Sequence, residues 1–176
     1  MKKRKEVYRL NKKDTQTQAV SYCAHNLLDV AEQKQYKVFA VSTSTQFKQY
    51  KEEMCRQTAA FLCQNGHKVT IIRLDWKEDA NSKTEIQRDA YTDICACNLS
   101  TEAFVELLLK ERESADLVLV DMPPVALLSQ ALEYAKQCDT VLLVEKYAYS
   151  KYKEFEKTLC ILKEHGLQVC GVVSYK

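Results

Sequence analysis

The sequence predicts an α/β fold: a mostly parallel sheet with helices on both faces. Two observations lead to this fold class. Short apolar runs alternate along the chain with longer segments whose apolar residues recur every three or four positions. The first pattern is typical of buried strands and the second of amphipathic helices. Strands joined by such helices make right-handed crossovers and pair in parallel, so we expect helices to cover both sheet faces.

The first half of the chain alternates regularly between the two patterns. Asp14 or Thr15 is a suitable N-cap for a helix whose apolar residues are Ala19, Cys23, Leu27 and Val30. The apolar run 38–41 predicts a buried strand. A helix is predicted from about 51 to 64, where Asn65-Gly66 is a C-cap signal, and a second strand is predicted for 69–74.

The second half continues the alternation after a polar interruption. The segment 76–92 is expected to be a loop of marginal structure, followed by a strand near Ile94. Ser100 or Thr101 can cap the next helix, which has Glu102 in its first turn, where the helix dipole favours an acid. Apolar runs and helical spacing predict the remaining elements: strand 117–120, helix 127–136, strand 140–144, helix 152–165 and strand 169–173.

The composition favours one compact domain. Of 176 residues, 46% are hydrophobic and 28% charged, which is enough apolar material for one core. Only three glycines and two prolines are present, so no flexible linker is expected. We predict a basic N-terminal tail over 1–13 and a single domain over 14–176. No apolar run approaches the roughly 20 residues of a membrane helix and no signal peptide is evident, so a cytoplasmic location is expected.

The eight cysteines are expected to be reduced in that compartment. Cys63, Cys160 and Cys170 stand among apolar neighbours and are predicted to be small buried hydrophobes. Cys95 and Cys97 form the only close pair. Without a second pair or a nearby histidine, that pair is a weak metal signal, and no metal site is predicted there.

The net charge of +2 conceals a basic N-terminus. Lys2, Lys3, Arg4 and Lys5 are suited to peripheral contact with anionic lipid at the inner face of a membrane, or with an acidic partner; the alternative is a disordered tail. Nucleic-acid binding is not expected, because no aromatic residues beyond Tyr8 are interleaved with these charges.

The most informative stretch is the apolar run 117–120, which ends in Asp121 and is followed by Pro123-Pro124. A strand of this kind delivers its carboxylate to the carboxyl edge of the sheet, where open α/β folds bind ligands. The prolines cannot continue the strand and fix the exit of the chain. A strand end capped by solvent is the alternative interpretation of the same residues.

The order of these pieces resembles the bacterial protein-tyrosine kinases, the cytoplasmic P-loop kinases of capsule and exopolysaccharide systems that are related to MinD and ParA. The similarity runs from Gln18 to Tyr175 and is best preserved at 115–124, 140–144 and 171–173. It implies a P-loop NTPase-like three-layer sandwich, with Asp121 ending a Walker B strand. ATP and magnesium would be the cofactors if the chain is active.

The phosphate-binding loop departs from that family. The family has a glycine-rich loop that ends G-K-[ST]-T, and the resemblance places Lys51 at the lysine, after a loop that includes Ser44 and Thr45. Tyr50 replaces a glycine, and Glu52 replaces the magnesium-binding hydroxyl. A carboxylate about 4 Å from phosphate costs on the order of 4 kcal/mol at an effective dielectric of about 20. The resemblance therefore implies a degenerate loop with little or no ATP binding.

The second strand has lost part of its motif too. The family's D-x-D-x-R falls on 73–77, so that its first aspartate is Arg73 and its second is Asp75. If the chain is active, Asp121 and Asp75 would be the catalytic and magnesium-binding carboxylates, and Lys51 would contact phosphate. If it is not, we expect Arg73 to pair with Asp121, and Lys51 to pair with an acid on its own helix.

Two further family features are missing. The E-A-Y-R-x-x-R pattern of ring assembly falls on 18–24, where neither the glutamate nor the arginines are present, so the family's ring is not expected. The C-terminal tyrosine cluster has no counterpart before Lys176. Tyr147, Tyr149 and Tyr152 form a local cluster for which packing is the expected role; whether any is phosphorylated is left open.

Three functions fit these observations. The favoured one is a pseudokinase domain that regulates or scaffolds capsular or exopolysaccharide biosynthesis through a protein partner, either a membrane activator or a kinase. The second is an ATP-dependent protein-tyrosine kinase that is active or activated by a partner. The third is an α/β binding protein whose crevice takes another ligand.

Overall fold

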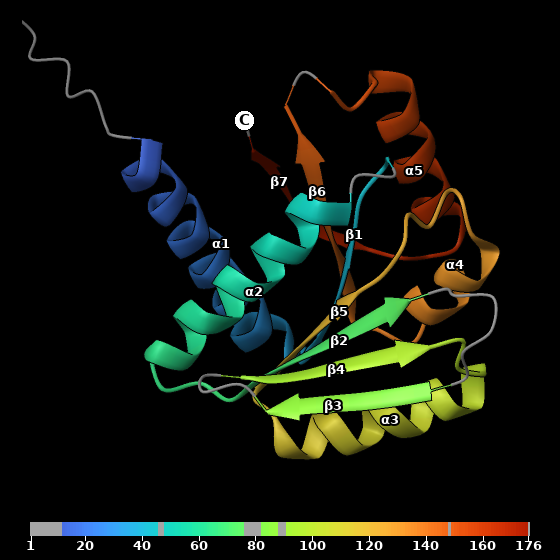
Figure 1. Ribbon diagram of the computed structural model, residues 1–176. Coiled ribbons are helices and arrows are strands. Elements are labelled where there is room, and N and C mark those ends of the chain that lie inside the picture. Colours follow the sequence, from blue (N-terminus) through green and yellow to red (C-terminus); the bar gives the residue numbers. More distant parts are fainter. Residues whose placement is uncertain (1–11, 46–47, 76–81, 88–90, 148, 176) are drawn as a thin grey trace, which may run out of the picture.

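The computed structural model describes residues 12–45, 48–75, 82–87, 91–147 and 149–175. Over this part of the chain it shows a seven-stranded sheet in the order β3-β4-β2-β5-β1-β6-β7 (Figure 1). The strands are β1 (Val38–Ser42), β2 (Val69–Asp75), β3 (Ser82–Gln87), β4 (Thr92–Cys97), β5 (Leu117–Asp121), β6 (Thr140–Lys146) and β7 (Val169–Tyr175). All pair in parallel except β3, which is antiparallel to β4. The predicted mostly parallel sheet is confirmed.

Five helices in the described residues complete the three layers: α1 (Lys12–Lys34), α2 (Lys48–Gln64), α3 (Thr101–Ser114), α4 (Ser129–Ala135) and α5 (Tyr152–Glu164). The buried residues of α1 and α2 pack with Phe39 and Val41 of β1 on one face of the sheet. Those of α3, α4 and α5 pack with Val38 and Ala40 on the other. Alternate side chains of one strand thus serve two cores, as expected for a sheet buried on both faces.

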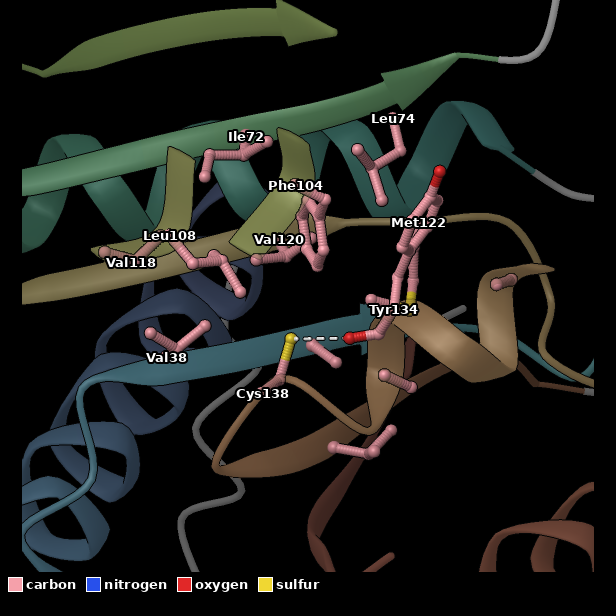
Figure 2. Packing of buried hydrophobic residues seen from close by; sticks show 14 of the residues in the cluster. Val38, Ile72, Leu74, Phe104, Leu108, Val118, Val120, Met122, Tyr134 and Cys138 are labelled. Carbon is pink, nitrogen blue, oxygen red and sulfur yellow. Dashed lines mark hydrogen bonds between the residues drawn. The ribbon is translucent and has the colours of Figure 1, made fainter. Parts of the chain in front are cut away.

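The core on the α3 and α4 side is shown in Figure 2. Phe104 of α3 and Tyr134 of α4 have ring centroids 4.6 Å apart, and both side chains are buried against Met122, just beyond β5. The Tyr134 hydroxyl donates to the carbonyl oxygen of Leu99, so the polar end of the ring is satisfied. This packing fixes the chain directly after Asp121, and so helps to position the carboxyl end of β5.

Strand β3 lies inside the segment that was predicted to be a loop. Its sequence, Ser82 to Gln87, has Ile86 as its only apolar residue, so it shows no apolar run. An antiparallel strand at the edge of a sheet needs only backbone pairing on one side, and therefore tolerates polar residues.

The predicted ends match at Gln64 of α2 and Tyr152 of α5, and most of the other helix ends differ by a few residues. The first helix begins at Lys12, before Asp14, and the second at Lys48 instead of Lys51. Ser100 is the N-cap of α3 as predicted, with its side chain accepting from the amide of Ala103 at 3.2 Å. Helix termini follow local capping geometry, which apolar spacing alone does not specify.

The cysteine prediction is wrong for one residue. All eight cysteines lie within the described residues and are free thiols. Cys63 and Cys170 are half-buried, but Cys160 is exposed on α5. The apolar neighbours of Cys160 belong to the opposite face of a helix that covers the sheet with one side only.

Candidate metal-ligand groups and helices that could span a membrane are both absent from the described residues. Among the described residues, no group of three potential metal ligands comes together, at Cys95 and Cys97 or elsewhere. No helix in that part of the chain is both long and apolar enough to span a membrane. The predicted membrane-contacting residues Lys2, Lys3, Arg4 and Lys5 lie outside the described residues, so their role stays a prediction. Lys12 and Lys13, the last residues of the predicted tail, belong to α1.

Candidate functional site

The candidate site lies at the carboxyl edge of the sheet, where β1, β2 and β5 end side by side. Asp121 is the last residue of β5 and pairs in register with Val41 of β1 and Arg73 of β2. Asp75 is the last residue of β2. The chain leaves β1 through Thr43 and Ser44 toward α2, which brings Lys51 back over this edge. The side chains of Lys51, Asp75 and Asp121 line one cavity at this edge.

The Lys51 ammonium group is buried against Asp121. Its Nζ donates to Oδ1 of Asp121 and to the carbonyl oxygen of Met122. The two side chains are only 3% and 5% exposed, so this is a buried ion pair between α2 and β5. The expected pairing of Lys51 with an acid on its own helix is wrong, because the side chain points into the sheet edge while Glu53 pairs with Arg56 on the helix surface.

Arg73 pairs with Asp93. The expected pairing of Arg73 with Asp121 is wrong. Its Nε donates to Oδ1 of Asp93 at 2.8 Å, and Asp93 is only 1% exposed. Arg73 and Asp121 are register partners and share a face of the sheet, but Lys51 already occupies the Asp121 carboxylate. Burial acts to lower the pKa of Arg73, but its hydrogen bond to Asp93 and the charge of that carboxylate outweigh burial and raise it.

These residues enclose a small cavity of about 60 Å³. Its lining residues are Lys51, Glu52, Arg73, Leu74, Asp75, Cys95, Asp121 and Pro123. Pockets that enclose small-molecule ligands typically have volumes of about 300–1,000 Å³. The cavity around the predicted catalytic residues is therefore too small, as it stands, for a nucleotide.

The start of the loop after β1 is bound to a carboxylate of the protein itself. Glu145, near the end of β6, accepts from the backbone amide and the hydroxyl of Ser44, both at 2.7 Å. The Ser150 hydroxyl donates to the same carboxylate, which is 6% exposed. The sequence prediction did not include Glu145; an acid directly after the apolar run 140–144 was the available signal.

Ser44 and Thr45 border a different, larger cavity of about 460 Å³. Its other lining residues are Ala126, Leu127, Tyr149, Lys151, Glu154 and Lys157. The residues predicted as one phosphate-binding loop are thus divided between two cavities, with Lys51 and Glu52 in the small one. Tyr50 is 42% exposed, and the Lys146 ammonium lies 4.8 Å from the centre of its ring.

The tyrosine cluster after β6 does not pack into the core. Tyr147, Tyr149 and Tyr152 are 64%, 54% and 75% exposed, so the expected packing role is wrong. All three lie in the loop between β6 and α5 or in the first turn of α5, where the chain turns through solvent. Lys146 contacts the Tyr149 ring at 5.1 Å from its centroid.

Known proteins similar to this chain include bacterial tyrosine kinases. The tyrosine-protein kinase wzc of Salmonella typhimurium is 36% identical over 75 residues, which make up 43% of this chain. That stretch spans only 10% of the length of the kinase. The kinase domain of Escherichia coli tyrosine kinase ETK superposes with a TM-score of 0.79 at 20% identity, over 98% of this chain and 84% of that domain.

The chain resembles the bacterial tyrosine kinases, in sequence over these 75 residues and in fold over nearly its whole length. The VpsO kinase domain agrees, with a TM-score of 0.75 at 17% identity over 92% of this chain and 94% of that domain. The cell-division protein MinD of Aquifex aeolicus shares the wider fold, at a TM-score of 0.60 and 14% identity over 78% of this chain and 68% of MinD. No protein-family model matches the sequence. The predicted resemblance and the P-loop NTPase-like three-layer fold are confirmed.

Proposed function

We propose that this relative of the bacterial tyrosine kinases is a pseudokinase domain, which keeps the fold and transfers no phosphate. Its role would be to regulate or scaffold capsular or exopolysaccharide biosynthesis through a protein partner, such as a membrane activator or a kinase. The observation that carries this proposal is the buried pair of Lys51 and Asp121. The two residues expected to serve phosphate and magnesium bind each other instead.

A nucleotide would have to break that pair. Separating the partners of a buried ion pair leaves uncompensated charge and costs roughly 3–5 kcal/mol. A cost of about 4 kcal/mol corresponds to about a thousandfold in affinity. New contacts from Lys51 to phosphate, and from Asp121 to magnesium, would first have to offset this loss.

The residues around the pair disfavour the binding of phosphate. Glu52 lines the same cavity and would repel it, and Tyr50 stands where a glycine would let the backbone approach. Among the described residues, no buried side-chain nitrogen or oxygen lacks a hydrogen-bond partner. Every buried polar side-chain group in that part of the chain already has a hydrogen-bond partner, so this arrangement does not fit magnesium-ATP.

A second candidate function has one observation in its favour. Lys51, Asp75 and Asp121 all line one cavity, so the charged groups required by an ATP-dependent tyrosine kinase are retained in one place. A partner that drew Lys51 away from Asp121 would make them available to magnesium-ATP. This alternative predicts activity only in the presence of the partner.

Calorimetric titration with magnesium-ATP and magnesium-ADP, followed by mass spectrometry for phosphotyrosine, tests the proposal. We expect no binding heat and no phosphotyrosine on the purified chain. Lys51→Met serves as the control for residual signal from contaminating kinases. Phosphotyrosine that appears with the wild-type chain and disappears with Lys51→Met would show that the domain is an active kinase.

A further inference from the structure

Two exposed large apolar side chains, Leu127 and Tyr149, line the larger cavity. Among the described residues, six of the nine exposed large apolar side chains follow β5 or β6, or begin α2. Loops that follow parallel strands gather at the carboxyl edge of a sheet (Figure 1). These six residues are Tyr50, Leu127, Leu128, Tyr147, Tyr149 and Tyr152. Tyrosines grouped around a concave site are typical of protein interfaces.

The groove itself combines apolar and cationic walls. We use the name tyrosine–lysine groove for the cavity of about 460 Å³ lined by Ser44, Thr45, Ala126, Leu127, Tyr149, Lys151, Glu154 and Lys157. Ala126, Leu127 and the Tyr149 ring provide apolar surface. The polar lining comprises the Thr45 hydroxyl, the Ser44 hydroxyl that is bonded to Glu145, the Lys151 and Lys157 ammonium groups, and the Glu154 carboxylate. Its volume is in the range that encloses a ligand, unlike the cavity around Lys51.

The rim of the groove is positively charged. The segment 145–157 contains four lysines and three glutamates, of which Glu145 is buried. Lys151 is the N-cap of α5 and provides no side-chain hydrogen bond to the helix, whose amino end carries a partial positive charge. Glu154 offsets part of this charge through a long ion pair with Lys151 at 3.8 Å. Lys157 has no ion-pair partner among the described residues, so an excess of positive charge remains.

The walls of the groove are held in place without a ligand. Glu145 accepts hydrogen bonds from Ser44 on one side and from Ser150 on the other, which ties the loop after β1 to the loop before α5. The Lys146 ammonium lies over the rings of both Tyr50 and Tyr149 and restrains their orientations. Preorganised side chains lose less conformational entropy when a ligand binds.

We infer that the tyrosine–lysine groove docks an acidic peptide segment of a partner protein that carries a large apolar side chain. The carboxylates of the segment would meet Lys151 and Lys157, and its apolar side chain would lie against Leu127 and Tyr149. A concave, preformed groove favours a peptide over a flat membrane surface. The inference rests on the proposed scaffolding function and specifies the chemistry of its partner.

A labelled random copolymer of glutamate and tyrosine is a direct probe of this groove. Fluorescence anisotropy, without nucleotide, should show saturable binding to the wild-type chain. We expect Lys157→Glu to weaken binding by about tenfold, since reversing one charge replaces an attraction by a repulsion of similar size. Lys163→Glu is the matched control: the same change on an exposed lysine of α5 outside the groove, with little effect expected.

A second pair of variants tests the apolar wall. Leu127→Ala removes an apolar side chain that is 52% exposed at the groove, and Leu109→Ala removes one that is 59% exposed on α3. Only the first should weaken binding of the copolymer. Circular dichroism and thermal unfolding of all four variants verify that each remains folded.

Several outcomes would overturn the inference. One is a failure of the wild-type chain to bind the copolymer, and another is equal weakening of binding by the groove variants and their controls. Binding to phosphatidylglycerol vesicles that depends on Lys157, with no binding of the copolymer, would assign the groove to a membrane. Phosphorylation of the copolymer after magnesium-ATP is added would contradict the pseudokinase proposal, while groove-dependent binding would still support the docking site.

Discussion

Lys51 and Asp121 stabilise the fold only as a pair, because both side chains are almost fully buried. We expect Lys51→Met to lower the free energy of unfolding by roughly 3–5 kcal/mol, since it leaves the Asp121 carboxylate buried without a cation. The double variant Lys51→Met with Asp121→Asn should recover part of the loss, because no buried charge is then unpaired. Urea denaturation of the two single variants and the double variant measures this coupling. Strictly additive losses would show that the two side chains do not interact.

Asp139 gives the fold a dependence on pH. Its carboxylate accepts hydrogen bonds from the backbone amides of Lys37 and Val38, both at 2.8 Å, and pairs with Arg112 at 2.6 Å. Burial acts to raise the pKa of Asp139, but the hydrogen bonds from Arg112 and from the two amides outweigh burial and lower it. The stabilisation is therefore complete above the ordinary pKa of an aspartate and is lost as the pH falls through the lowered pKa.

The variant Asp139→Asn isolates this contribution. At pH 7 it should lower the free energy of unfolding by about 1.5–3 kcal/mol, the usual range for hydrogen bonds to a charged group. The difference from the wild-type chain should shrink as the pH falls below about 3.9, the ordinary aspartate pKa. Urea denaturation across this pH range measures the difference. A difference that stays constant with pH would show that the charge of Asp139 does not contribute.

At the scale of the elements, the backbone is strained at the end of α1, and a glycine there would relieve the strain. Gln35 follows the last helical residue with a φ of 57°, a conformation that favours glycine. Gln35→Gly should raise the free energy of unfolding by about 0.5–1 kcal/mol. Gly166→Ala, at the corresponding end of α5 with a φ of 70°, should lower it by about 1 kcal/mol. Thermal unfolding compares the two, and a shift of both in the same direction would contradict this argument.

The elements also show what sequence patterns can and cannot predict. The strands 38–41, 69–74 and 117–120 were predicted because strands buried on both faces must be apolar throughout. Strand β3 was missed because an edge strand has no such requirement. The edge that holds Asp121 followed from topology, since parallel strands all end on the same side. The partners of Lys51 and Arg73 could not be predicted from topology, because those pairs depend on side-chain distances between elements that are far apart in sequence.

At the scale of the whole molecule, the P-loop NTPase-like fold is present, and residues predicted to bind phosphate are bound to other residues of the protein. The two halves of the predicted phosphate loop have separate partners: Ser44 is bound to Glu145, and Lys51 to Asp121. The larger cavity lies beyond them, beside α5, and is lined by different chemistry. This division is the basis of our proposal that the domain binds a partner and transfers no phosphate.

Thermal unfolding with and without millimolar magnesium-ATP and magnesium-ADP tests this central claim most directly. A ligand at 100 times its dissociation constant stabilises the native state by about 2.7 kcal/mol. For a domain of this size, that is a shift in Tm of several degrees. We predict no shift with either nucleotide, because Lys51 and Asp121 satisfy each other. A magnesium-dependent rise of several degrees would contradict the pseudokinase proposal and show that the site still binds nucleotide.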